Sequence, residues 1–151
     1  MSAAHESARE DCPRCSGLAE EPPGGWVYED DLWATAVFDH MGVPGWLMTV
    51  LKRHAEATTE LTQEEAESLG PLMVKLSRAI EEATGCERVY MQMYGEHYRH
   101  WHFMLCAREE HIPAEHRVWN FSVHHSDYVD LERAHEVAGR IRAALAHEAT
   151  R

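Results

Sequence analysis

The sequence lacks any long apolar run, because no stretch of its 151 residues approaches the 18 or more apolar residues that cross a bilayer. The first residues, MSAAHESARED, also lack the apolar segment of a secretory signal. There are no internal repeats, low-complexity tracts or interdomain linkers. These absences predict one cytoplasmic domain over residues 1–151, without a membrane partner and large enough for its own core.

Basic residues are also scarce. The chain has 14 Lys and Arg against 26 Asp and Glu, which gives a formal charge of -12. A general nucleic-acid binder needs a basic face, so this balance argues against a nucleic-acid partner. A small phosphorylated ligand remains compatible with it, because a few local cations and backbone amides are enough to bind one.

Only four cysteines are present, and without a secretory signal they indicate thiols or metal ligands rather than disulfides. Cys12 and Cys15 form the motif CPRC in a polar arm, followed by a Pro- and Gly-rich stretch at 20–25. A redox CxxC usually follows a strand and opens a helix inside a βαβ unit. We therefore interpret CPRC as half of a metal site.

The other half has to come from the 12 histidines, since a structural zinc site is closed by four Cys or His ligands. His54 follows an apolar segment, and His100 begins an alternating one. They are the natural candidates if these two segments lie side by side. Spacing alone does not separate them clearly from His5, His40 or His97.

The segment 100–107 alternates with a period of two, which is typical of a β-strand. One face carries Trp101, Phe103 and Leu105 and is predicted to be core. The other carries His100 and His102, followed by Met104, Cys106 and Arg108. Imidazoles are costly to bury, so the pair is either a hydrogen-bonded polar pair or a metal ligand and a nucleophile.

The remaining pattern predicts an α+β fold with an antiparallel sheet. Thr62 and Glu65 form a capping box before an apolar stripe that ends at Gly85, which predicts a long helix. A second helix is expected over 130–147 after an irregular segment, 109–125. Strands are expected at 26–29, 32–38, 46–51, 88–94 and 100–107. The chain thus divides into an arm (1–25), a core (26–108) and a C-terminal extension (109–151).

Several of these segments resemble one family. HWHFMLCAR is similar to the signature strand of the histidine-triad (HIT) superfamily, in which three histidines alternate with apolar residues and an arginine closes the strand. CPRC resembles the CxxC of its zinc-containing bacterial branch, VYEDDLWATAVFDH its first hairpin, and GWLMTVLKRH the strand that follows. The resemblance implies a HIT-like sheet of about five strands with a long helix and a C-terminal helix, and often a homodimer.

The resemblance also implies roles for individual residues. His102 matches the nucleophile that attacks an α-phosphate, Asp39 the aspartate that holds the ribose, and Arg108 the closing arginine near the phosphate end. The ligands of a structural zinc ion match Cys12, Cys15, His54 and His100.

Two departures from the family pattern bear on activity. Met104 occupies the third triad position, where a hydrogen-bond donor to the phosphate normally stands, and methionine cannot donate. Losing one such donor commonly costs on the order of a hundredfold in rate. Glu96 and His97 replace the usual Gln-Ser/Thr loop, so a protonated His97 is a candidate surrogate donor to the phosphate.

The leading hypothesis is a zinc-stabilised hydrolase or nucleotidyl transferase that cleaves a phosphoanhydride or phosphoramidate of a nucleotide through a covalent His102 intermediate. One alternative is a binding protein for a nucleotide or phosphate ester that does not turn it over. Another is a repurposed enzyme that uses His102, His97 and Cys106 on a non-nucleotide substrate. Outside the site, Trp119 is predicted to pin the irregular segment to the core, and 124–127 to be a polar loop.

Overall fold

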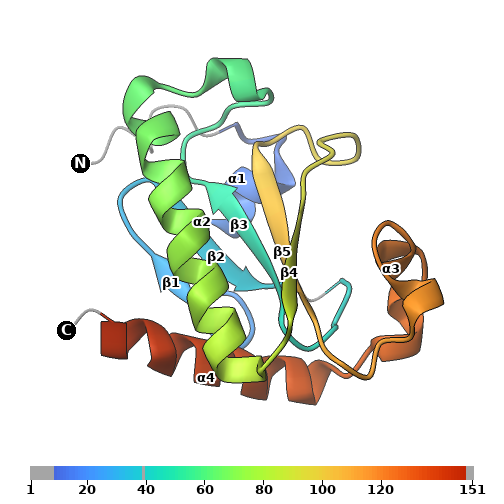
Figure 1. Cartoon of the computed structure of the whole chain (residues 1–151). Helices are drawn as coiled ribbons and strands as arrows, with labels where there is room; N and C mark the ends of the chain where they lie inside the picture. Colours follow the sequence, from blue (N-terminus) through green and yellow to red (C-terminus); the bar gives the residue numbers. More distant parts are fainter. Residues whose placement is uncertain (1–8, 39, 149–151) are drawn as a thin grey trace.

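The computed structural model describes residues 9–38 and 40–148, and it contains one antiparallel five-stranded sheet (Figure 1). The strand order is β1-β2-β3-β5-β4. The α+β fold with about five strands is therefore confirmed. The strands are β1 Tyr28–Glu29, β2 Trp33–Val37, β3 Trp46–Leu51, β4 Arg88–Gln92 and β5 His102–Arg108.

Two long helices cover one face of the sheet, α2 Gln63–Thr84 and α4 Leu131–Glu148 (Figure 1). Helix α2 begins at the expected capping box, in which Thr62 and Glu65 each bond the other's backbone N–H, and it ends at Gly85 with φ of 68°. The residues packed beneath both helices include the predicted core face of β5, namely Trp101, Phe103 and Leu105. Among the described residues, no helix is both long and apolar enough to span a membrane.

The opposite face carries a second, smaller core. Helix α1, Pro13–Gly17, lies on this side, and the short helix α3, Asn120–Val123, lies beyond the β4 edge in Figure 1. The predicted irregular segment is therefore partly helical, with further turns at Ala114–His116 and His125–Tyr128. Met104 and Cys106 are buried there, so β5 is covered on both faces.

The expectation for Trp119 was wrong, because its side chain is 73% exposed. Phe121 anchors the segment instead: it is 1% exposed, and its ring meets that of Trp46 edge-on, with centroids 4.9 Å apart. Phe121 rather than Trp119 is buried because α3 begins at Asn120, after Trp119, and Phe121 lies on the buried side of this single helical turn.

The pairing of β3 with β5 determines which histidines lie close together. β3 and β5 are antiparallel neighbours, and Val50 is paired with His102. His54 follows the end of β3, and His100 precedes the start of β5, so both lie at the same end of the sheet. This adjacency is the condition that the sequence left open for a shared metal site.

Candidate metal centre and nucleophile

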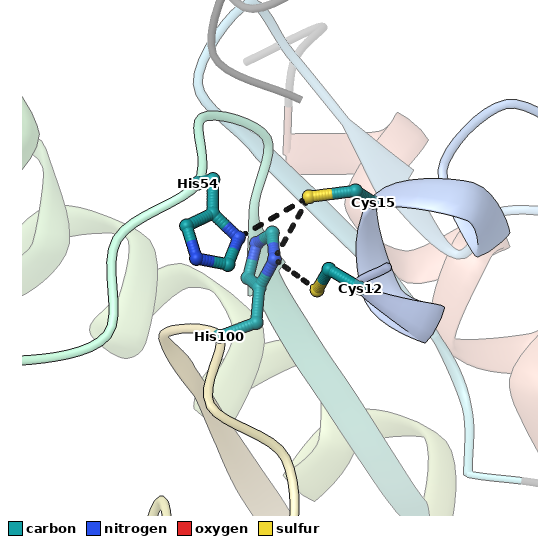
Figure 2. A group of neighbouring side chains, drawn as sticks. All are labelled: Cys12, Cys15, His54 and His100. Carbon is teal, nitrogen blue, oxygen red and sulfur yellow. Dashed lines mark hydrogen bonds between the residues drawn. The ribbon is translucent and has the colours of Figure 1, made fainter. Parts of the chain in front are cut away.

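Four side chains converge at this end of the sheet, Cys12 and Cys15 from the α1 region and His54 and His100 from the two strand ends (Figure 2). Nδ1 of His100 lies 3.4 Å from both sulfur atoms, and Nδ1 of His54 lies 3.3 Å from that of Cys15. All four candidate ligand atoms lie within 4.8 Å of one another. The four predicted zinc ligands are thus brought together, while His40 and His97 lie outside this group and His5 outside the described residues.

A backbone carbonyl orients one of the ligands. Nε2 of His100 is 2.6 Å from the carbonyl oxygen of Leu51, and a carbonyl can only accept a hydrogen bond. The proton must therefore sit on Nε2, which leaves the lone pair of Nδ1 aimed at the two sulfurs. Burial lowers the pKa of His100, so the ring is neutral, the form that binds a metal.

These distances fit zinc. Zinc–sulfur bonds of about 2.3 Å and zinc–nitrogen bonds of about 2.05 Å put the sulfur–nitrogen edge of a tetrahedron at about 3.6 Å, close to the separations seen here. Burial raises the pKa of the Cys15 thiol, so a thiolate at this position requires a neighbouring cation. The cluster therefore fits a closed structural zinc site, as the sequence predicted.

His102, the first residue of β5, has its tautomer fixed in the opposite sense. Its Nδ1 is 2.6 Å from the carbonyl oxygen of His100, so Nδ1 carries the proton and Nε2 keeps its lone pair. Burial lowers the pKa of His102, and the positive charge of Arg14 lowers it further. A neutral imidazole with an accessible Nε2 lone pair is the form that acts as a nucleophile.

A cavity of about 170 Å³ opens beside His102. His97, Tyr98 and Met104 contribute to its wall, so the structure brings together three predicted site residues, His102, His97 and Met104. A second cavity, of about 290 Å³, adjoins it across Phe38 and Met48, which line both. Each is smaller than the roughly 300–1,000 Å³ of ordinary ligand sites, but together they reach that range.

Other predicted residues are not brought to this cavity. Arg108 lies six residues along β5 from His102, roughly 20 Å away at the rise of a strand. It donates to Glu87 across 2.7 Å, and it is absent from the walls of both cavities. Cys106 is fully buried, and burial raises its pKa, so it is a filler of the second core. Asp39 lies outside the described residues.

Sequence reasoning missed Arg14. It stands inside the CPRC motif, and its guanidinium carbon lies 4.3 Å from the ring centroid of Tyr98 and 5.7 Å from that of Phe38. Its Nε and Nη2 atoms are buried and have no hydrogen-bond partner within the part of the chain that the structure describes. The signal in the sequence was an arginine between two zinc-binding cysteines, at a position where nothing in the motif itself requires a charge.

A second group of candidate ligands, His116, His124 and Asp127, also lies within 4.8 Å. The two imidazole rings are stacked, 4.0 Å between centroids and 6° from parallel. A metal ion binds in the plane of an imidazole ring, and two rings stacked at this angle have no common in-plane position within bonding distance of both. The arrangement is therefore a stacked pair on a polar surface, consistent with the expected polar loop.

The fold and the two histidine environments define a protein of the histidine-triad fold with a closed metal centre, and solved structures agree. A Zn-bound histidine triad family protein from Mycobacterium smegmatis is 18% identical over 93% of this chain and 96% of its own, with a TM-score of 0.70. A hypothetical histidine triad nucleotide-binding protein from Sulfolobus tokodaii is 19% identical over 90% of this chain and 93% of its own, with a TM-score of 0.71.

A uridylyltransferase also aligns, at 23% identity and a TM-score of 0.64, over 96% of this chain but only 49% of its own. This chain thus spans about half the length of that enzyme. No family model and no curated protein matches the sequence. At these identities the likeness shows the fold, and at that level the resemblance predicted from HWHFMLCAR and CPRC is confirmed.

Proposed function

We propose that this chain binds a nucleotide or a related phosphate ester and cleaves it at the α-phosphate through a covalent intermediate on His102. The observation that carries this proposal is the hydrogen bond from Nδ1 of His102 to the carbonyl oxygen of His100, because it leaves the Nε2 lone pair available on a residue that lines a cavity. Two of the similar structures bear names that include nucleotide binding or uridylyl transfer, which supports the substrate class.

In the first step, Nε2 of His102 attacks the α-phosphorus, and the bond from phosphorus to the leaving oxygen or nitrogen breaks. The leaving group takes a proton from water. In the imidazolium that forms, Nδ1–H still donates its hydrogen bond to the carbonyl oxygen of His100, and this bond stabilises the positive charge. In the second step, water attacks the phosphorus, the phosphorus–nitrogen bond breaks, and a water proton passes to solvent. A second alcohol in place of water makes the same reaction a transfer.

The two adjoining cavities suggest how the ligand is placed. The phosphate lies beside His102, where a protonated His97 donates to it, and the nucleoside extends across Phe38 and Met48 into the second cavity. Asp39 remains the predicted ribose ligand from the sequence. When zinc is bound at the four ligands, its contribution is structural, since it fixes the loop that leads into β5.

The test is turnover of a panel of dinucleoside polyphosphates and nucleoside phosphoramidates by wild type, His102→Ala and His111→Ala. His111 is a matched control, because it is 54% exposed and lies outside both cavities. Removing the nucleophile should lower kcat by at least roughly 10⁴-fold, while the control retains wild-type rates. Zinc content is measured first in each preparation, so that a misfolded protein is not counted.

Met104 favours a second candidate, a nucleotide or phosphate-ester binding protein without turnover. The side chain lies in the cavity wall at the third triad position and offers the phosphate no hydrogen-bond donor. In that case zinc-loaded wild type binds AMP but turns over no member of the panel, and His102→Asn leaves the affinity unchanged. Turnover that depends on His102 would exclude this candidate.

A further inference from the structure

Arg14 is a half-buried cation, and part of the hydrogen-bonding capacity of its guanidinium group is not used. Two of its three guanidinium nitrogens, Nε and Nη2, are shielded from solvent and have no hydrogen-bond partner among the described residues. Among residues 9–38 and 40–148, no carboxylate forms an ion pair with it. Burying a guanidinium without an anion is unfavourable, so a position of this kind is suited to an anionic ligand.

The side chain packs against two residues that form the wall of the cavity beside His102. Its guanidinium stacks on Tyr98 and lies near Phe38, and both of these rings line that cavity. The rings of Tyr98 and His102 are themselves 6.4 Å apart between centroids. Arg14 itself lines the adjoining cavity, which shares Phe38 and Met48 with the cavity beside His102.

The two other site residues predicted on β5 are poorly suited to hold a phosphate. Met104 has no proton to donate, and Arg108 is paired with Glu87 at the far end of β5. Arginine, in contrast, presents a planar fork of N–H groups that matches two phosphate oxygens at once.

We propose that Arg14 donates hydrogen bonds to the non-bridging oxygens of the phosphoryl group that His102 attacks, in place of the donor lost at Met104. This inference rests on the proposed function and deepens it. It also gives the CPRC motif a second role, because Arg14 stands between two zinc ligands. Residues 12–15 then both anchor the arm and position the phosphate donor, which favours a pre-organised site.

The experiment compares wild type with Arg14→Gln, Arg14→Lys and the control Arg99→Gln. Arg99 is a matched cation on the same side of the molecule, 79% exposed and paired with Glu56. Calorimetric titrations use three probes, inorganic phosphate, AMP and adenosine. Zinc content and melting temperature are recorded for each variant, because Arg14 neighbours two zinc ligands and a loss of zinc would mimic a loss of binding.

Arg14→Gln should weaken the binding of phosphate and AMP by about 10- to 100-fold, since a charge-assisted hydrogen bond is lost. Adenosine, which has no phosphate, should bind all variants equally. Arg14→Lys should recover only part of the loss, and Arg99→Gln should match wild type. Equal phosphate and AMP affinities in zinc-loaded wild type and Arg14→Gln would overturn the inference.

The two proposals fail in different ways. Loss of phosphate binding in Arg14→Gln, together with no nucleotide binding by wild type, supports the Arg14 site and overturns the nucleotide substrate. Turnover that depends on His102 but not on Arg14, with AMP affinity unchanged, overturns the Arg14 site alone. A zinc-loaded wild type that binds neither phosphate nor AMP overturns both.

Discussion

At the scale of single residues, two backbone carbonyls assign opposite tautomers to histidines only two positions apart. The carbonyl of Leu51 accepts a hydrogen bond from Nε2–H of His100 and leaves Nδ1 to face the cysteines, whereas the carbonyl of His100 accepts from Nδ1–H of His102 and leaves the Nε2 lone pair unprotonated. The same residue type therefore serves as a structural ligand at one position and has the form of a nucleophile at the next. The side chains alone do not determine this division.

Met104→Gln should raise kcat on the phosphoramidate and dinucleotide panel by on the order of a hundredfold, because the amide supplies the phosphate with a donor that methionine lacks. Met48→Gln is the control. Met48 pairs with Met104 across β3 and β5 and lines the same cavity, but it belongs to a different strand. Steady-state rates of the three proteins test this. If both glutamine variants are equally active, the gain does not come from the triad position.

The family resemblance selected the four residues of the zinc cluster and His102, whereas spacing alone left other histidines open as ligands. Arg14 was missed, since a charge inside a CxxC motif is ordinarily solvated. Only the packing of Arg14 against Tyr98 and Phe38 shows that its guanidinium group is partly shielded from solvent.

At the scale of elements, the long regular segments matched their expected bounds closely. The capping box and Gly85 bounded α2 as predicted, because capping depends on a few adjacent residues. Segment 109–125 was harder to predict, since its short helical turns are stabilised by contacts with β3 and β4. Phe121 packs against Trp46 and Tyr90, which are distant in sequence.

Phe121→Ala should lower the free energy of unfolding by about 3–5 kcal/mol, because it empties an aromatic position in the second core. Trp119→Ala should change it by no more than about 0.5 kcal/mol, since that side chain is 73% exposed. Urea denaturation of both variants at neutral pH makes the comparison. A larger loss for Trp119→Ala would restore the original expectation that this tryptophan anchors the segment.

At the scale of the whole molecule, the metal centre joins parts of the chain that are far apart in sequence. Cys12 and Cys15 belong to the arm, His54 to the end of β3, and His100 to the connection before β5. Cross-linking three segments through one ion stabilises the folded state, because the unfolded chain does not hold the four ligands together.

Zinc removal by a chelator should therefore lower the melting temperature, by about 2–4 °C for each kcal/mol of lost stability in a chain of this size. Cys15→Ser should lose the metal and melt at the temperature of the chelated protein. Cys86→Ala is the control, since Cys86 lies in the main core away from the cluster and should retain zinc. Metal analysis and thermal melts check this, and full zinc occupancy in Cys15→Ser would contradict the assignment of the ligands.

A homodimer and a cytoplasmic location stay predictions of the sequence analysis, to be tested by light scattering and by fractionation.

The sequence by itself determined the α+β class, the long helix, the alternating strand and the residue types that bind zinc, because these follow from periodicity, capping and side-chain chemistry. Only the tertiary structure decided that His54 and His100 meet the cysteines, that Arg108 pairs with Glu87, and that Arg14 is half-buried against Tyr98. Strand order and register are non-local: they depend on which segments pair across the sheet.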